Sequence, residues 1–469
     1  GAFFYGHWPC PLEHLLDWKK KAEAMGLAVH FINVPLGHPG DSLGAKSGTF
    51  PLTPPEHWRL ASRPDGTTYA GTSLHAPATE ENCAALKQLV AAGADIVFLD
   101  DDFRLARGPG VIGGCFCDEH RKRFCGSHGY SAAQWSALLD DVKERRSSEI
   151  LKAWVNFTCD ELTGCFRAQQ AAAPSIQLGN MVMYLGAEKA GIRLEDYAGV
   201  PVRVGELMFD DRSFDQLRGK TNELFSALFH RRYVSPELAY SETTAYPSDK
   251  LSAANMAAKL TISTIADVRN TMFMSGVTPF PQEHWATLGP AMHAQAELHM
   301  RVAGKSPRGP FKHYWGEASR FVGDDEPYSL FLACGVPFEV RYTLSPDHHC
   351  NGFDRPFQED GVVFLSDADA LTPAASTDFR LVARTAHANV RGVPETLDAL
   401  FALKRELRTQ WKDMPLIDED KPAVCAWYPD AGGVLVWNLS PTREAFTVVR
   451  GETRKEITLD PLASTFVEI

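Results

Sequence analysis

The sequence lacks any long hydrophobic run and any excess of positive charge. No apolar stretch approaches the roughly 18 to 20 residues of a membrane-spanning helix, so we expect no membrane partner. Lys and Arg number 47 against 59 Asp and Glu, which gives 47 − 59 = −12. Because such a chain has no global positive field to attract a phosphate backbone, we also expect no nucleic acid partner.

Cysteine is sparse as well. The 10 cysteines among 469 residues are too few for a disulfide scaffold, which favours a reducing compartment and therefore the cytoplasm. No basic stretch followed by an apolar run and a cleavage site opens the chain, so no leader is visible. Residues 2–8 have the composition of a strand with no Met before it, and we interpret this start as a trimmed native N-terminus.

Short β-rich apolar runs alternate with segments of helical period over about the first 300 residues. The candidate strands are residues 3–8, 27–34, 69–75, 96–103, 176–184, 202–210, 238–243 and 268–275. The candidate helices include residues 15–25, 81–92, 144–173, 214–229, 253–266 and 291–303. Eight parallel strands with intervening helices in a segment of about this length predict an α/β fold, a (β/α)8 TIM barrel over residues 1–305.

Two smaller domains are predicted after the barrel. A breaker-rich linker at residues 304–310 ends the alternation. Strands at 338–342 and 362–365 and a helix at 393–409 predict a small α/β domain over 306–415. Short strands separated by turn residues predict an antiparallel β-sandwich over 416–469.

Polar residues at the predicted strand ends are the candidates for chemistry, because the active sites of TIM barrels lie at the C-terminal ends of the strands. One strand ends in Asp100, Asp101 and Asp102, and another ends in Glu242. The residues expected to bind a substrate around them are Asp101, Arg104, His75, Asn180, Asp210, Tyr240 and Trp285. For His75 a structural role is about as well supported, and for Trp285 simple packing is the alternative.

Glycoside hydrolysis needs two carboxylates on opposite sides of one pocket. One acid protonates the leaving oxygen while the other attacks or stabilises an oxocarbenium-like centre. The alternative for a single strand-end acid is a cap or a salt bridge, such as Asp100 with Arg104. Three consecutive acids favour a functional site, since crowding of like charges raises the pKa of at least one of them.

The region around these acids resembles glycoside hydrolase family 42, the β-galactosidases of clan A. The similar residues are Asp100-Asp101-Asp102-Phe103, Cys115-Phe116-Cys117-Asp118, Phe124 and Gly129-Tyr130, which correspond to the family's Asp-Asn-Glu-Tyr, Cys-Tyr-Cys and Phe-containing helix. Residues 335–340 and 363–367 resemble the family's glutamine-amidotransferase-like domain. The resemblance implies a carbohydrate substrate, β-galactosidase-like activity without a required cofactor, and a homo-oligomer, either a trimer or a dimer.

Residue by residue, the resemblance places Asp102 at the acid/base position, Asp101 at the preceding Asn and Glu242 at the nucleophile. Because Asp is one methylene shorter than Glu, Asp102 requires a deeper substrate or a closer backbone, and Asp101 is an alternative acid. A retaining enzyme holds its carboxylates about 5 to 5.5 Å apart and an inverting one about 6.5 to 9.5 Å apart, so the shorter Asp leaves inversion open. A barrel that binds sugar, or acts as a scaffold, without catalysis is the other alternative.

Cys115, Cys117 and His120 have donor types and spacing compatible with half of a structural zinc site. The resemblance implies three cysteines from this loop and a fourth ligand from elsewhere. Here His120 stands where a third cysteine would lie, and Cys125 is the nearest candidate for the fourth ligand. The alternative is that these are buried or loop thiols. Metal-dependent hydrolysis at residues 100–102 would need clustered histidines at strand ends, which the sequence does not show.

Overall fold

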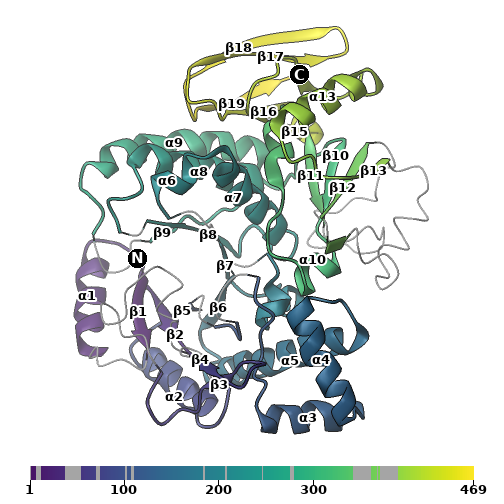
Figure 1. Ribbon diagram of the computed structural model, residues 1–469. Coiled ribbons are helices and arrows are strands. Elements are labelled where there is room, and N and C mark those ends of the chain that lie inside the picture. Colours follow the sequence, from purple (N-terminus) through teal and green to yellow (C-terminus); the bar gives the residue numbers. More distant parts are fainter. Residues whose placement is uncertain are drawn as a thin grey trace. The chain divides into compact units, whose positions relative to one another are not determined.

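The structure is a computed structural model (Figure 1). It describes residues 2–6, 12–36, 54–69, 74–100, 103–106, 110–182, 185–205, 209–245, 247–274, 279–341, 361–366, 368–369 and 389–469. The chain divides into two compact units. Unit 1 comprises Gly1–Arg203 and Arg320–Asp325, and unit 2 comprises Val204–Ser319 and Glu326–Ile469.

Unit 1 alternates parallel strands with helices. Its elements are β1 (Ala2–Gly6), α1 (Leu12–Ala24), β2 (His30–Val34), β3 (Ala61–Ser62), β4 (Thr68–Tyr69), α2 (Ala78–Ala91), β5 (Ile96–Leu99), α3 (Asp118–His128), α4 (Ala132–Glu144), α5 (Glu149–Ala172) and β6 (Gln177–Val182). The strand order is β1-β2-β5-β6, with β7 (Val202–Gly205) next to β6 at the boundary of the unit. The pairs β1 with β2, β2 with β5 and β5 with β6 are all parallel.

Local sequence accounts for several of these elements. The run Ile-Val-Phe-Leu of β5 is apolar and buried over its last three residues, as expected for a strand covered on both faces. Ser131 and Gln134 form a capping box that starts α4. Ser148 starts α5 by accepting a hydrogen bond from the Leu151 amide at 3.2 Å.

The predicted barrel strand at residues 69–75 lies partly outside the described residues, at 70–73, and its described first residue, Tyr69, does not join the barrel sheet. Thr68 and Tyr69 form β4, which pairs antiparallel with β3, and β2 pairs directly with β5. The physical reason is the turn between β3 and β4, where Gly66 has φ +83° and the Asp65 carboxylate accepts the Thr67 amide at 2.9 Å. This turn folds the chain back into a hairpin. The other predicted strands of the barrel are present in β1, β2, β5, β6, β7, β8 and β9.

Unit 2 begins with the later strands and helices of the barrel pattern. These are α6 (Asp211–Phe214), α7 (Leu217–His230), β8 (Ala239–Thr244), α8 (Ala253–Ala266), β9 (Phe273–Met274) and α9 (His284–Val302). β7, β8 and β9 are neighbours in that order, and β8 pairs parallel with β9. Ser252 caps α8, which lies where the sequence predicts it.

The predicted α/β layer and β-sandwich follow within unit 2. A four-stranded parallel sheet has the order β11-β10-β12-β13, and α13 follows it. The last strands form two three-stranded antiparallel sheets, β15-β16-β19 and β14-β17-β18, which share one hydrophobic core that includes Val436 and Val448. The bounds are β10 (Phe311–Tyr314), α10 (Glu317–Phe321), β11 (Phe338–Arg341), β12 (Val362–Leu365), β13 (Asn389–Gly392), α13 (Leu397–Leu407), β14 (Leu416–Ile417), β15 (Ala423–Tyr428), β16 (Gly433–Asn438), β17 (Glu444–Arg450), β18 (Thr453–Leu459) and β19 (Ser464–Glu468).

The domain boundaries at residues 305 and 415 remain predictions. Among the residues described, no helix is both long enough and apolar enough to cross a bilayer.

Candidate functional site

Glu242 lies near the end of β8 and is buried, with a relative exposure of 4%. Side chains alternate between the two faces of a strand, so Tyr240 and Thr244 share the face of Glu242. The Thr244 hydroxyl donates a hydrogen bond to Oε1 of Glu242 at 3.3 Å. The strand therefore fixes the direction of this carboxylate, with the predicted substrate residue Tyr240 beside it.

Asp100 ends β5, and its Oδ1 accepts a hydrogen bond from Nη2 of Arg203 on β7 at 3.1 Å. Both side chains are buried. The sequence suggests Arg104 as a partner of Asp100, and the structure shows the Arg104 side chain donating from Nε to the Ala106 carbonyl at 3.0 Å. The Asp100 carboxylate is thus engaged in a buried ion pair. Asp101 and Asp102 lie outside the described residues.

Asn180 on β6 is buried, and its Oδ1 accepts the Met181 amide at 2.9 Å. Arg203 contacts the Met181 sulfur at 2.9 Å, which puts Met181 on the face of the Asp100–Arg203 pair. Because neighbouring residues of a strand point to opposite faces, Asn180 lies on the other face of the sheet from that pair.

Asp210 is the N-cap of α6. Its carboxylate accepts the Ser213 amide at 2.8 Å, and hydrogen bonds from the side chain and backbone of Ser213 lower the pKa of Asp210 below its usual 3.8. The structure therefore gives this carboxylate a structural task as a helix cap. Its predicted contact with a substrate remains a prediction.

Trp285 lies in the first turn of α9 and is 48% exposed. Its ring packs edge-on against Phe273 and Phe280, with centroids 6.1 Å away in each case. Trp285 is thus an exposed aromatic surface supported by two other rings, a geometry that suits stacking on the apolar face of a sugar.

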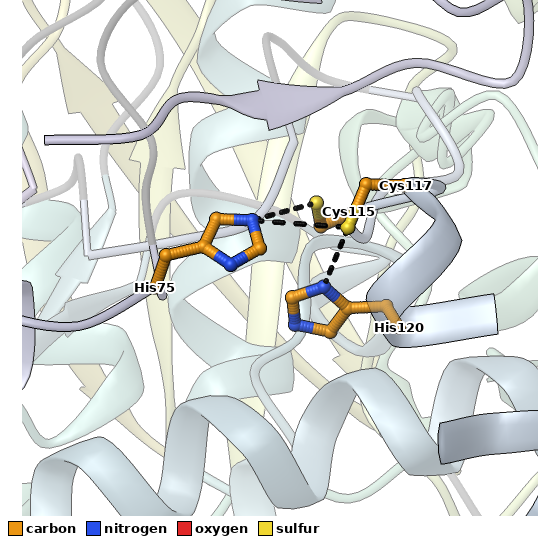
Figure 2. A group of neighbouring side chains, drawn as sticks. All are labelled: His75, Cys115, Cys117 and His120. Carbon is orange, nitrogen blue, oxygen red and sulfur yellow. Dashed lines mark hydrogen bonds between the residues drawn. The ribbon is translucent and has the colours of Figure 1, made fainter. Parts of the chain in front are cut away.

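The side chains of His75, Cys115, Cys117 and His120 converge in unit 1, and Figure 2 shows both imidazole rings facing the two sulfurs. All four are buried, and their donor atoms lie within 4.8 Å of one another. Nε2 of His75 is 3.5 Å from Sγ of Cys115 and 3.8 Å from Sγ of Cys117. Nδ1 of His120 is 3.2 Å from Sγ of Cys117.

The loop that carries the cysteines is fixed by its neighbours. Gly114 has φ +110°, and a Cβ there would lie 2.7 Å from the Trp154 ring, so glycine is required where the loop meets α5. The Ser62 amide of β3 donates to Sγ of Cys115 at 3.5 Å. Cys117 is the N-cap of α3, and His120 follows it by three residues, a spacing that puts both on one side of the first helical turn.

These four donors fit a tetrahedral zinc ion. Zinc binds cysteine sulfur at about 2.3 Å and histidine nitrogen at about 2.0 to 2.1 Å, so the ligand atoms of a tetrahedral site lie roughly 3.3 to 3.8 Å from one another. The distances from Nε2 of His75 to the two sulfurs and from Nδ1 of His120 to Sγ of Cys117 span 3.2 to 3.8 Å. Two thiolates and two neutral imidazoles would also balance the charge of a divalent ion.

Burial sets the protonation of this cluster. It lowers the pKa of His75, and it lowers the pKa of His120 to about 4, with the neighbouring His75 adding to the effect. Both rings are therefore neutral at pH 7, with a lone pair free to bind metal. Burial raises the pKa of the Cys115 thiol to about 11, so a metal that binds there must displace its proton.

The sequence found three of the four donors and missed the fourth. Cys125, the expected fourth ligand, lies half-buried on α3, and the structure has His75 in the cluster instead. His75 stands 40 residues before Cys115, beyond α2, so no short spacing could connect them. The structure places His75 with the cysteines, which agrees with the structural role that the sequence left open beside a contact with a sugar hydroxyl.

No protein-family model matches the chain, and no curated protein matches it. Solved structures do, and they share the (β/α)8 barrel class. The β-galactosidase from Rahnella sp. R3 has a TM-score of 0.52 at 12% identity, over 97% of this chain and 89% of that chain. The β-galactosidase from the psychrophilic Marinomonas ef1 has a TM-score of 0.50 at 8% identity, over 98% and 99% of the two chains.

A third match is Gan42B, a family 42 β-galactosidase from G. stearothermophilus, with a TM-score of 0.49 at 10% identity over 99% of this chain and 93% of that one. At the level of fold, the expected resemblance is confirmed by the two β-galactosidases with TM-scores of 0.52 and 0.50. The α/β TIM-barrel class is confirmed as well.

Proposed function

We propose that the protein is a glycoside hydrolase in which Glu242 is the nucleophile and Asp102 the acid/base. The observation that carries this proposal is the buried carboxylate of Glu242 near the C-terminal end of β8, where TIM barrels place catalytic groups. The fold shared with two β-galactosidases supports it and favours a β-galactoside as the first substrate to test.

The reaction would proceed in two steps with retention of configuration. Asp102 donates its proton to the leaving oxygen while the Glu242 carboxylate attacks the anomeric carbon, which breaks the glycosidic bond and forms a glycosyl ester. Asp102, now a carboxylate, takes a proton from water, and the resulting hydroxide displaces Glu242 from the sugar. Tyr240, on the face of Glu242, would bind the sugar near the ester.

The ion pair between Asp100 and Arg203 argues against Asp100 as the acid that protonates the leaving oxygen. A carboxylate held at 3.1 Å by the Arg203 guanidinium is stabilised as an anion, and an anion cannot protonate a leaving group. Asp101 and Asp102 remain, and the resemblance to family 42 favours Asp102 as the acid, with Asp101 as the alternative. An inverting enzyme that uses the same cluster is the second mechanism to distinguish.

A panel of aryl β-glycosides, headed by a β-galactoside, tests the activity. Wild-type protein should release the aryl alcohol, and Glu242→Gln and Asp102→Asn should each lose turnover while keeping the wild-type circular dichroism. Glu237→Gln is a matched control, because this exposed carboxylate precedes β8 and pairs with Arg269. Full activity in either site variant, or no release from any substrate, would contradict the assignment and favour a sugar-binding or scaffold barrel.

We also propose that His75, Cys115, Cys117 and His120 hold a structural zinc ion. A zinc bound there would crosslink the segment before α2 to the loop before α3 and to the first turn of α3. Two thiolates with two imidazoles are a donor set typical of structural zinc. All four ligand positions are filled by protein, so this site leaves no open position for chemistry on a substrate.

X-ray absorption at the zinc edge tests the ligand set. The wild-type spectrum should fit two sulfurs at about 2.3 Å and two nitrogens at about 2.0 to 2.1 Å. His75→Ala should remove one nitrogen, whereas Cys125→Ser should leave the spectrum unchanged. A third sulfur in the wild-type protein that disappears in Cys125→Ser would restore the ligand set expected from the sequence.

A further inference from the structure

The two histidines of the cluster present different ring nitrogens to the sulfurs. His75 offers Nε2 to Cys115 and Cys117, and His120 offers Nδ1 to Cys117. Each ring therefore turns its other nitrogen outward, Nδ1 in His75 and Nε2 in His120 (Figure 2). A metal-bound imidazole carries its hydrogen on that outward nitrogen, and the partner of the hydrogen fixes the ring.

A carboxylate faces each outward nitrogen. Oε2 of Glu119 on α3 is 3.7 Å from Nδ1 of His75, and Oε2 of Glu161 on α5 is 3.7 Å from Nε2 of His120. A shift of roughly 0.8 Å would bring either pair to an ordinary hydrogen bond of about 2.9 Å. Two glutamates from different helices thus occupy equivalent places behind the two rings.

Each carboxylate is itself held by an arginine. Arg59 donates from Nη1 to Oε2 of Glu119 at 2.9 Å, and Arg123 donates from Nη2 to Oε1 of Glu161 at 2.5 Å. In Glu161 the oxygen that faces His120 is therefore a different one from the oxygen that accepts from Arg123. The arrangement is a chain of arginine, carboxylate, imidazole and metal position on each side of the cluster.

We infer that Glu119 and Glu161 are positioning residues that fix the ring orientation and tautomer of His75 and His120 for metal binding. This inference rests on the zinc site proposed above and adds two residues that do not touch the ion. The two glutamates should contribute unequally to zinc affinity. The Glu161 side chain is 18% exposed and the Glu119 side chain is 55% exposed, so water competes more for Glu119, and Glu161 should matter more.

Zinc affinity of the full chain, measured by competition with a chromophoric chelator, tests the inference. Outer carboxylates of this kind contribute about 10- to 100-fold to metal affinity. Glu161→Gln should therefore weaken zinc binding by close to 100-fold and Glu119→Gln by close to tenfold. Asp118→Asn is the matched control, since it removes one carboxylate from the same turn of α3 but pairs with Arg121; its affinity should stay within about twofold of wild type.

The experiment distinguishes a failure of the proposed zinc site from a failure of the inference about Glu119 and Glu161. Wild-type protein that binds no zinc would overturn the zinc site and the inference together. Wild-type protein that binds zinc, with both glutamate variants indistinguishable from Asp118→Asn, would overturn the inference alone. Should Glu161→Gln fail to fold, Glu119→Gln decides, because its exposed pair with Arg59 contributes little to folding.

Nuclear magnetic resonance of histidine-labelled protein loaded with cadmium-113 supplies a second readout. Scalar coupling to the metal should appear at Nε2 of His75 and Nδ1 of His120, and the outward nitrogens should carry hydrogen. Coupling through the opposite nitrogen of either ring would contradict the assigned orientation. Glu161→Gln should broaden the His120 signals and leave those of His75 sharp, a change that a general loss of stability would not produce.

Discussion

The Cys/His cluster and the Glu242 carboxylate of β8 are both buried polar sites, but they differ in their chemistry. The cluster brings four possible metal ligands together, whereas β8 presents one carboxylate. In the cluster each of the four donors has a partner donor within 3.8 Å, and together they would supply every position of the proposed tetrahedral ion. Glu242 has a hydroxyl beside it at 3.3 Å on a strand that ends in a predicted barrel mouth. Four donors that suit one metal ion are expected to stabilise structure, whereas a carboxylate near the end of a barrel strand is expected to react with a substrate.

This difference predicts that loss of each site will affect a different property of the protein, either its stability or its turnover. Removing metal should lower stability and spare the turnover of folded enzyme, and removing the Glu242 carboxylate should do the reverse. A ligand at 1,000 times its Kd contributes about 4 kcal/mol. Chelation, or Cys117→Ser, should therefore lower Tm by roughly 8 to 16 °C if unit 1 unfolds by itself, and by about 4 °C if the whole chain unfolds as one. The initial rate at low temperature should be unchanged for the protein that remains folded.

Glu242→Gln completes this experiment. It should lower kcat by about 10⁴-fold or more and leave Tm within a few degrees of wild type, since Gln keeps the shape and the hydrogen bond to Thr244. Loss of kcat on chelation in protein that stays folded would contradict the separation and make the metal part of the reaction.

The Asp100–Arg203 ion pair at the end of β5 is a third buried polar site that can be compared with these two. Asp100→Asn leaves the buried Arg203 charge with less compensation, and breaking such a pair costs about 3 kcal/mol or more. Urea denaturation should show that loss, while kcat should fall less than tenfold. Asp118→Asn serves again as control, with a change within about 0.5 kcal/mol. A collapse of kcat with unchanged stability would instead make Asp100 the catalytic acid.

Much of the barrel was predictable because local signals agree with the tertiary arrangement. The apolar runs of β5 and β6 and the capped helix α8 lie where the sequence places them. Residues 69–75 have a composition that suits a strand equally well in a barrel or in a hairpin. The Asp65-Gly66 turn places Tyr69, the first of them, in the hairpin.

Site residues were predictable only where chemistry follows from position along one element. The position of Glu242 near the end of β8 follows from the strand count, and the grouping of Cys115, Cys117 and His120 follows from their short spacing. His75, Glu119 and Glu161 come together through packing of separate segments, which spacing does not encode. Asp210 is predicted to be a site residue because it follows a strand, and the same residue also starts the next helix.

Asp210→Ala tests whether Asp210 acts as the N-cap of α6 or as a contact for the substrate. Loss of an N-cap costs about 1 kcal/mol, so Tm should fall by roughly 2 to 4 °C at pH 7, with KM unchanged. Because the folded pKa of Asp210 is lowered, its contribution is present above the unfolded pKa of about 3.9 and is lost as pH falls through the folded value. The Tm difference between Asp210→Ala and wild type should therefore shrink below about pH 4. A rise in KM would establish the predicted substrate contact.

Trp285→Ala should give the smallest effect. Loss of an exposed stacking ring costs about 0.5 to 1 kcal/mol, equivalent to a roughly two- to fivefold rise in KM with kcat within twofold. Met300→Ala on the same helix is a control, since Met300 is also exposed and lies near its other end. Equal KM values for the two variants would show that Trp285 only packs on Phe273 and Phe280.

The most direct test of the proposed reaction is to trap its intermediate. A 2-deoxy-2-fluoro-β-galactosyl fluoride slows both steps and, in a retaining enzyme, accumulates the glycosyl ester on the nucleophile. Mass spectrometry of the intact protein should show one added fluorosugar, and peptic digestion should locate it on Glu242, with Glu242→Gln unlabelled. A label on any other residue, or turnover of aryl galactosides with inversion and no label, would contradict the assignment of Glu242 as nucleophile.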